Sequence, residues 1–126
     1  MDMNKTGEYA FTIVVPVYNE TDNIYDLEKS LSGFLPKSIL KACVLFVDDG
    51  STDGSLEKIR EICDRNKDFY YISFAKNAGL SAAIKAGFDY ACSEYVGYMD
   101  ADLQTTPEDF NLLLKDIGDK SMMIGI

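Results

Sequence analysis

Residues 94–110 read EYVGYMDADLQTTPEDF, and this stretch shows how the chain is built. Its first part is apolar and predicts a buried strand, after which two carboxylates follow at Asp100 and Asp102. Alternate side chains of an extended backbone point to the same side, so Asp100, Asp102 and Gln104 can reach one point beyond the strand. Three oxygen ligands suit a Mg2+ or Mn2+ ion that keeps positions open for phosphate. A solvated acidic loop has the same local sequence, and the motif alone does not separate the two interpretations.

The same succession of strand and helix repeats along the whole chain. Apolar segments rich in β-branched and aromatic residues alternate with segments in which apolar residues recur every three or four positions. This alternation predicts an α/β, Rossmann-like domain with a mainly parallel sheet and helices on both faces. At 126 residues the chain is long enough for one core, and we expect one domain over 1–126. The expected strands cover 11–17, 42–47, 69–74, 95–99 and 121–126, and the expected helices cover 24–34, 56–63, 80–91 and 110–117.

Two local features refine this expectation. Pro16 lacks the backbone N–H that a strand ladder needs, so we expect the first strand to end there. The third helix presents small side chains at Ala83 and Gly87, which predicts that it lies close against the sheet.

Composition narrows the classes of function. The net charge of −9, from 21 acidic and 12 basic residues, argues against nucleic acid or an anionic membrane as a partner. The chain has no histidine, which excludes a Ser-His-Asp triad and a His-ligated zinc ion. No apolar run approaches the ~20 residues that cross a bilayer. The cysteines are odd in number, widely spaced and in or beside apolar segments, which predicts reduced thiols in the core and a cytoplasmic location: Cys43, Cys63 and Cys92.

Several acidic side chains follow predicted strands and are expected to meet at one edge of the sheet. The carboxyl ends of parallel strands share an edge, where ligands of such folds bind. A cluster of like charges is repulsive unless a cation lies within it, which again indicates a metal ion. The acids of this expected rim are Glu20, Asp48, Asp49, Asp100 and Asp102.

Other side chains on this edge suit a nucleotide. Glu20 and Asp49 are placed to accept hydrogen bonds from base N–H groups or ribose hydroxyls. Tyr18 either stacks on a base or packs at the strand end, and Lys76 either contacts a diphosphate or is a solvated charge. The sequence leaves both of these alternatives open.

Four linked motifs resemble those of the family 2 glycosyltransferases, which are inverting enzymes of the GT-A fold. The resemblance spans residues 11 to 117. The motif DADLQ at 100–104 is most similar to the polyprenyl-phosphate branch of the family. That branch contains the dolichyl-phosphate mannose synthases and the bacterial undecaprenyl-phosphate glycosyltransferases. The motifs are VPVYNE at 15–20, VDDGSTD at 47–53, KNAG at 76–79 and DADLQ at 100–104.

The resemblance implies roles for individual residues. By this likeness Asp100, Asp102 and Gln104 bind a Mg2+ or Mn2+ ion and a diphosphate. The residues implied to line the nucleotide pocket are Pro16, Tyr18, Glu20 and Asp49. We add Lys76 and Asp100 as nucleotide-binding candidates, because both follow expected strands at the same edge.

The resemblance also implies a donor, an acceptor, and separate parts of the enzyme that bind them. The expected donor is a UDP- or GDP-sugar, and the expected acceptor is a polyprenyl phosphate or a saccharide. In the family the catalytic base and the acceptor-binding elements follow the fifth strand. We therefore expect 1–126 to be the nucleotide-binding half, inactive in transfer by itself, with membrane association only through a C-terminal part.

Three other interpretations compete with this one. A response-regulator receiver has an acidic pair after its first strand and a phosphorylated Asp after its third, whereas these strands are followed here by PVYNE and AKNAG. A haloacid-dehalogenase-type phosphatase has its Asp-x-Asp motif on the first strand, where small residues and Thr follow it. Here the motif follows the fourth expected strand, and Leu-Gln comes next. A sugar-nucleotide-binding module without transfer activity is the alternative that the sequence leaves open.

Overall fold

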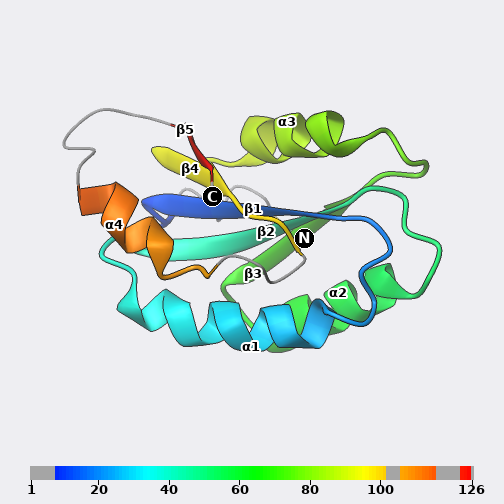
Figure 1. Ribbon diagram of the computed structural model, residues 1–126, viewed down its shortest axis with the longest axis horizontal. Helices are drawn as coiled ribbons and strands as arrows, with labels where there is room; N and C mark the ends of the chain where they lie inside the picture. Colours follow the sequence, from blue (N-terminus) through cyan, green and yellow to red (C-terminus); the bar gives the residue numbers. More distant parts are fainter. Residues whose placement is uncertain (1–7, 102–105, 116–122, 126) are drawn as a thin grey trace.

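The strands form one parallel sheet in the order β3-β2-β1-β4-β5 (Figure 1). The computed structural model describes residues 8–101, 106–115 and 123–125. The predicted fold class, a Rossmann-like α/β domain, is confirmed. The strands are β1 (Phe11–Val17), β2 (Ala42–Asp48), β3 (Phe69–Ser73), β4 (Tyr95–Tyr98) and β5 (Met123–Gly125). The helices are α1 (Ile24–Phe34), the short 3-10 helix η2 (Leu35–Lys37), α2 (Ser55–Arg65), α3 (Leu80–Tyr90) and α4 (Asp109–Lys115).

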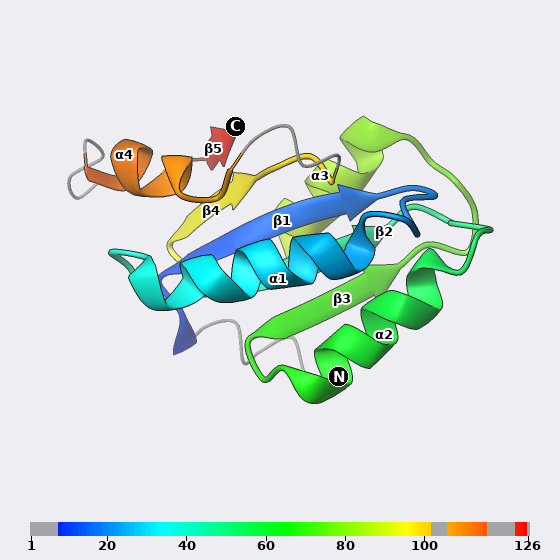
Figure 2. The ribbon, with the colours of Figure 1, turned by 60° about the horizontal axis from the view of Figure 1, so that its bottom comes forward.

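Helices cover both faces of the sheet, as the sequence predicts. Helices α1, α2 and α4 pack on one face, and α3 packs on the other (Figures 1 and 2). Alternation along β1 separates the two cores: Ile13 and Val15 join the core of α1, α2 and α4, whereas Val14 joins that of α3. Strands buried on both faces explain the nearly continuous apolar runs in the sequence.

The apolar stripe of α1 is buried in full. Its residues Ile24, Leu27, Leu31 and Phe34 recur at helical spacing, and each is 0% exposed. Phe110 of α4 reaches the same core and contacts the Phe11 ring edge-on, with ring centroids 5.1 Å apart. The periodicity in the sequence therefore identified the correct helix face.

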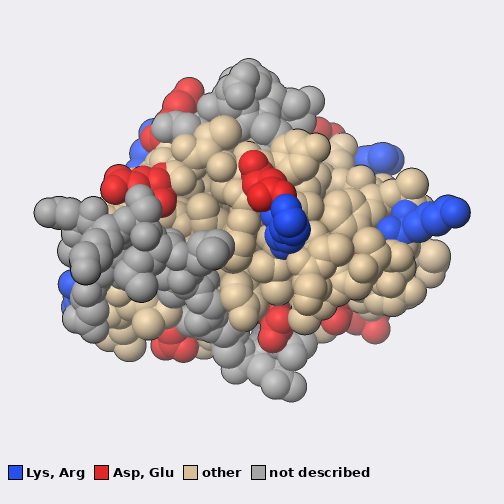
Figure 3. All heavy atoms as spheres, turned by 90° about the horizontal axis from the view of Figure 1, so that it is seen from above, with Lys and Arg blue, Asp and Glu red and all other residues tan. Residues whose placement is uncertain are grey.

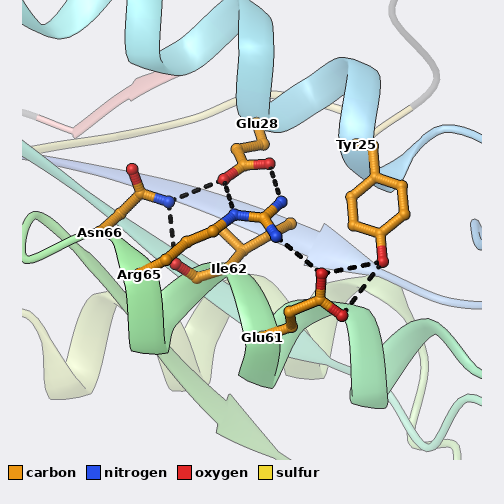
Figure 4. A network of polar contacts seen from close by, with 6 residues as sticks. All are labelled: Tyr25, Glu28, Glu61, Ile62, Arg65 and Asn66. Atoms are coloured by element: carbon orange, nitrogen blue, oxygen red, sulfur yellow. Dashed lines mark hydrogen bonds and ion pairs between the residues drawn. The ribbon is translucent and has the colours of Figure 1, made fainter.

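A surface network joins α1 to α2 (Figure 4). Arg65 donates from Nε to Glu28 at 2.7 Å and from a terminal nitrogen to Glu61 at 2.7 Å. The Tyr25 hydroxyl donates to the same Glu61 carboxylate at 3.2 Å. The hydrogen bond from Arg65 holds the pKa of Glu28 below its usual value, although burial raises it. Because Arg65 and Glu61 are largely exposed, their ion pair contributes about 1 kcal/mol or less, whereas the Glu28 side chain is only 15% exposed.

The expected strand end at Pro16 is wrong. Pro16 lies within β1, opposite Val47 of β2. The amide of Asp49 donates to the Val17 carbonyl at 2.8 Å, so the backbone polar groups of Val17 point toward β2. Those of the preceding residue, Pro16, therefore point toward β4. The β1–β4 ladder runs only to the pair of Val14 with Tyr98. The missing N–H of Pro16 therefore lies where no partner strand continues.

The cysteines differ in exposure more than the sequence predicts. Cys43 is buried and Cys63 is half-buried, and burial raises the pKa of each thiol to about 12. Cys92 is exposed, so the expectation of a core thiol is wrong there. It follows α3 in a turn, where an apolar neighbourhood in sequence does not imply burial.

The outer side of α3 carries little charge. Lys85 and Asp89 are its only charged residues, and they pair with each other at 2.7 Å. The described part of this face is otherwise mostly uncharged (Figure 3). It presents no stripe of basic side chains for nucleic acid, and no described helix is long and apolar enough to cross a bilayer.

The close approach of α3 to the sheet depends on Gly87. A Cβ atom at this position would lie 2.4 Å from Cγ1 of Val14, which is fully buried in the central strand. We predict that Gly87→Ala lowers the free energy of unfolding by about 1–3 kcal/mol, because neither element can move without losing packing. Urea denaturation measures this change.

Gly33→Ala is the matched control for this prediction. Gly33 lies within α1, and nothing surrounds an added Cβ atom within 4 Å. This substitution should leave the stability unchanged or raise it by up to about 1 kcal/mol. Equal midpoints for the Gly87 variant and the unaltered protein would contradict the proposed packing constraint.

Candidate functional site

The order of the strands reverses at β1. Helices α1 and α2 carry the chain from β1 to β3 on one face, and α3 then brings it back on the other face to pair β4 with β1. Ligands of open α/β sheets bind outside the carboxyl ends of the strands at such a reversal. A hollow of about 310 Å3 lies there, with walls from residues that follow four strands, among them Tyr18, Glu20, Asp49, Asn77, Gly79 and Asp100.

The structure thus brings most of the predicted site residues together. Pro16, Tyr18, Glu20, Asp49 and Asp100 all line this hollow. Tyr18 is 47% exposed, so its side chain is accessible to a ligand. Glu20 is half-buried and accepts a hydrogen bond from Nδ2 of Asn23 at 2.9 Å. Their roles in binding remain predictions.

The loops after β1 and β2 bind each other. The amide of Asn19 donates to Oγ of Ser51 at 3.0 Å, and the amide of Thr52 donates to Oδ1 of Asn19 at 2.8 Å. Farther along, the amide of Glu20 donates to Oγ of Ser55 at 3.0 Å. Asn19 has φ +53, a left-handed conformation that Asn tolerates better than most residues. These contacts position Tyr18 and Glu20 on the wall of the hollow.

Two of the predicted rim acids are buried and accept hydrogen bonds within the protein. Asp48 is 1% exposed and accepts from Oγ of Ser73 at 3.2 Å and from the amide of Ser51 at 3.3 Å. Asp49 is 4% exposed and accepts from the segment 77–79. The argument that five clustered acids require a cation is therefore weaker than the sequence suggests.

Asp100 is the candidate metal ligand that the structure describes. It is exposed, it lines the hollow, and it accepts no hydrogen bond from another described residue. The other two predicted ligands, Asp102 and Gln104, lie outside the described residues. Within 8–101, 106–115 and 123–125 no three acidic or cysteine side chains lie close enough together to hold a metal ion.

Lys76 differs from the other predicted residues. It is exposed and does not belong to the lining of the hollow, so its contact with a diphosphate remains a prediction. Its backbone packs under Gly50. The sequence analysis assigned no role to three further lining residues: Asn77, Gly79 and Leu80. Their position directly after the third strand could have indicated that they belong to the site.

A larger hollow of about 460 Å3 lies at the opposite, amino edge of the sheet. Tyr9, Lys41 and Asp68 are among its lining residues, and the last residues of α1 and α2 lie beside it. Its lining also includes Lys41, Arg65 and Lys67, so charge does not exclude an anionic ligand there. The hollow at the strand reversal is the better candidate for a nucleotide because ligands of open α/β sheets bind at that place.

Comparison with known proteins identifies relatives over most of the chain. Glycosyl transferase family 2 matches residues 12–125. A dolichol-phosphate mannosyltransferase of Saccharomyces cerevisiae is 34% identical over 116 residues, which are 91% of this chain and 43% of that protein. An undecaprenyl-phosphate 4-deoxy-4-formamido-L-arabinose transferase of Aeromonas hydrophila is 34% identical over 114 residues, 90% of this chain and 35% of that protein. The chain thus spans less than half the length of these relatives.

Solved structures share the fold. A mannosyltransferase of Pyrobaculum calidifontis, in complex with GDP-Man and Mn2+, superposes with a TM-score of 0.74 at 24% identity, covering 88% of this chain and 33% of that one. Residues 1–349 of S. aureus TarS, in complex with UDP-GlcNAc, superpose with a TM-score of 0.67 at 26% identity, covering 83% and 30%.

Asp53 provides a test of how the two loops are joined. Its carboxylate accepts hydrogen bonds from the amide of Thr21 at 3.1 Å and from the amide of Ser55 at 3.0 Å. Burial raises the pKa of Asp53, but the hydrogen bond from the Ser55 hydroxyl at 2.6 Å and those from the amides outweigh it, so the net pKa is lowered from 3.8. The charged form therefore stabilises the fold above pH 3.8, and this contribution is lost as the pH falls through the lowered pKa.

We predict that Asp53→Ala costs about 1 kcal/mol at pH 7 and that the difference shrinks below pH 3.8. Urea denaturation at several pH values measures it, with Asp64→Ala on the exposed end of α2 as the control. A cost that does not change with pH would contradict this account of the loop contacts.

Proposed function

The chain belongs to glycosyl transferase family 2, and we propose that it binds the nucleotide-sugar donor of a metal-dependent, inverting glycosyl transfer. The observation that carries the proposal is the hollow at the strand reversal, which is lined by the exposed Tyr18 and by Asp100, a carboxylate that accepts no hydrogen bond from another described residue. An aromatic ring suits a base and a carboxylate suits a ribose hydroxyl, and a diphosphate would bind beside Asp100 through a divalent cation. The names of the relatives, and the nucleotide sugars bound in the two structures, support it.

In this proposal each wall of the hollow has a task. Tyr18 and Pro16 offer an apolar surface to the base, because an aromatic ring and a proline pack flat against one. Glu20 accepts a hydrogen bond from a base N–H or a ribose hydroxyl, and Asp49 is assigned to the same part of the pocket. Lys76 supplies positive charge to the diphosphate from the loop after β3.

The residues fit a divalent cation at the carboxyl end of β4. Asp100 presents an exposed carboxylate on the wall, and we assign Asp102 and Gln104 as further oxygen ligands. Carboxylate and amide oxygens are the ligands that Mg2+ and Mn2+ take in proteins. When bound, such an ion offsets the charge that develops on the departing nucleoside diphosphate.

The transfer step itself involves groups beyond the hollow. An acceptor oxygen attacks the anomeric carbon from the side opposite the diphosphate, and the bond from that carbon to the diphosphate breaks, which inverts the configuration. We propose a polyprenyl phosphate as acceptor, after the names of the relatives. A phosphate acceptor is already ionised, whereas a saccharide hydroxyl needs a general base. We place the acceptor site and any such base in the part of the relatives that this chain does not span.

Titration calorimetry with GDP and UDP tests the donor site. We expect each nucleotide to bind more tightly with MnCl2 or MgCl2 than with EDTA, because metal and phosphate offset each other's charge next to an acidic wall. The matching nucleoside without phosphate should show no dependence on the metal. Nucleotide affinity that is equal with and without a divalent cation would overturn the metal dependence.

We predict that Asp100→Asn and Asp102→Asn each weaken metal-dependent nucleotide binding by about tenfold or more, since each removes a ligand charge at constant volume. Asp64→Asn makes the same chemical change at the far end of α2 and should bind as the unaltered protein does. Equal affinities for all four proteins, at unchanged melting temperatures, would rule out these two carboxylates as metal ligands.

A further inference from the structure

The carboxylate of Glu20, on the wall of the hollow, is held by a residue three positions farther along the chain. Nδ2 of Asn23 donates to Oε2 of Glu20 at 2.9 Å, and the amide of Asn23 donates to the Glu20 carbonyl, also at 2.9 Å. The two residues thus contact each other through side chain and backbone. Oε1 of Glu20 accepts no hydrogen bond from another described residue, so it is available to a ligand of the hollow.

Asn23 stands at the start of α1, but its side chain does not cap the helix. It occupies the N-cap position, and its carbonyl accepts a hydrogen bond from the amide of Leu27 at 2.9 Å. The side-chain oxygen of an N-cap asparagine usually accepts from an amide in the first turn. Asn23 makes no such side-chain hydrogen bond. Its amide group instead donates to Glu20, so a local contact that would stabilise α1 is absent in favour of one that orients a carboxylate.

The backbone of Glu20 is fixed from the side of α2. The hydroxyl of Ser55 is fully buried; it accepts from the amide of Glu20 at 3.0 Å and donates to Oδ1 of Asp53 at 2.6 Å. The other carboxylate oxygen of Asp53 accepts from the amide of Thr21. With the main chain held in this way, most of the remaining freedom of Glu20 lies in its side-chain torsions. The contact with Asn23 restricts these torsions before any ligand binds.

We propose that Asn23 is a positioning residue of the donor site, which holds Oε2 of Glu20 and so presents Oε1 to the nucleotide. The inference rests on the proposed function of the hollow, and it gives Asn23 a task there that is separate from starting α1. A carboxylate that is already ordered binds more tightly, because less side-chain freedom is lost on binding. A capping residue would act on the stability of α1 and would have no selective effect on the nucleotide.

Asn23→Ser and Asn23→Asp separate these two roles. Asn, Asp and Ser are about equally good N-cap residues, so α1 keeps a side chain that can cap it in both variants. Neither variant keeps the donor to Glu20, because a serine hydroxyl is one bond shorter than the amide and an ionised aspartate has no donor. Melting temperatures report the stability, and titration calorimetry with GDP and UDP in the presence of MnCl2 reports the binding.

Asn66→Ser is the matched control. Nδ2 of Asn66 donates to Oε2 of Glu28 at 2.7 Å, which is the same kind of contact between an amide and a carboxylate (Figure 4). Asn66 lines the other hollow, at the amino edge of the sheet. Its substitution should therefore affect the stability and leave both nucleotide affinities unchanged.

We expect Asn23→Ser and Asn23→Asp to bind GDP and UDP about threefold to tenfold more weakly, at melting temperatures within about 5 °C of the unaltered protein. Glu20→Ala should weaken binding by at least the same factor. Because Asn23 acts through Glu20, adding Asn23→Ser to Glu20→Ala should cause no further loss. Unchanged affinity in both Asn23 variants would overturn the proposal, and so would a further loss by the full factor in the double variant.

A second measurement needs neither a ligand nor a variant of Asn23. The side-chain amide signal of Asn23 in the NMR spectrum should shift in Glu20→Ala, whereas that of Asn66 should not. An unchanged Asn23 signal would show that the contact with Glu20 does not exist in solution, and the proposal would fail. If the unaltered protein binds neither nucleotide, the proposed function fails, and this signal still decides whether Asn23 holds Glu20.

Discussion

The reversal of strand order at β1 is the constraint on which the rest of the structure depends. Because β1 pairs with β2 on one side and β4 on the other, the chain runs outward to β3 along the face of α1 and α2 and returns to β4 along the face of α3. The loops that follow four strands border the hollow beyond the carboxyl end of β1. The constraint is maintained by packing. Val14 of β1 leaves room for α3 only because position 87 is a glycine.

Acidic residues at this edge serve two different purposes. Asp49 and Asp53 accept hydrogen bonds from backbone N–H groups of neighbouring loops and so join these loops, whereas Asp48 accepts from the amide of Ser51 in its own turn. Asp100 has no such partner among the described residues and faces the hollow. A net charge of −9 therefore does not measure how many carboxylates are available to a ligand. Burial and hydrogen bonding within the protein take up two of the five rim acids, Asp48 and Asp49.

The relation to other glycosyltransferases is confined to a part of their length. The chain covers 43% of the yeast relative and 35% of the one from Aeromonas hydrophila, and the superposed structures share the sheet and its covering helices. The shared part contains the strand reversal and the loops that border it. The proposed division between a donor-binding part and a separate acceptor side follows from this placement, because everything that these residues build lies on one edge of one sheet.

The sequence by itself determined the elements, the parallel sheet and the helix faces. Apolar periodicity marked the buried stripe of α1, and small residues marked the close face of α3, because both signals depend on neighbours within a few positions. Only the tertiary structure decided that Pro16 continues its strand, that Cys92 is exposed, and that Asp49 faces a loop 28 to 30 residues away. Those outcomes depend on which segments meet in space. A carboxylate has the same sequence signature whether it accepts from a backbone amide or binds a ligand, so its partner is settled only when the chain is folded.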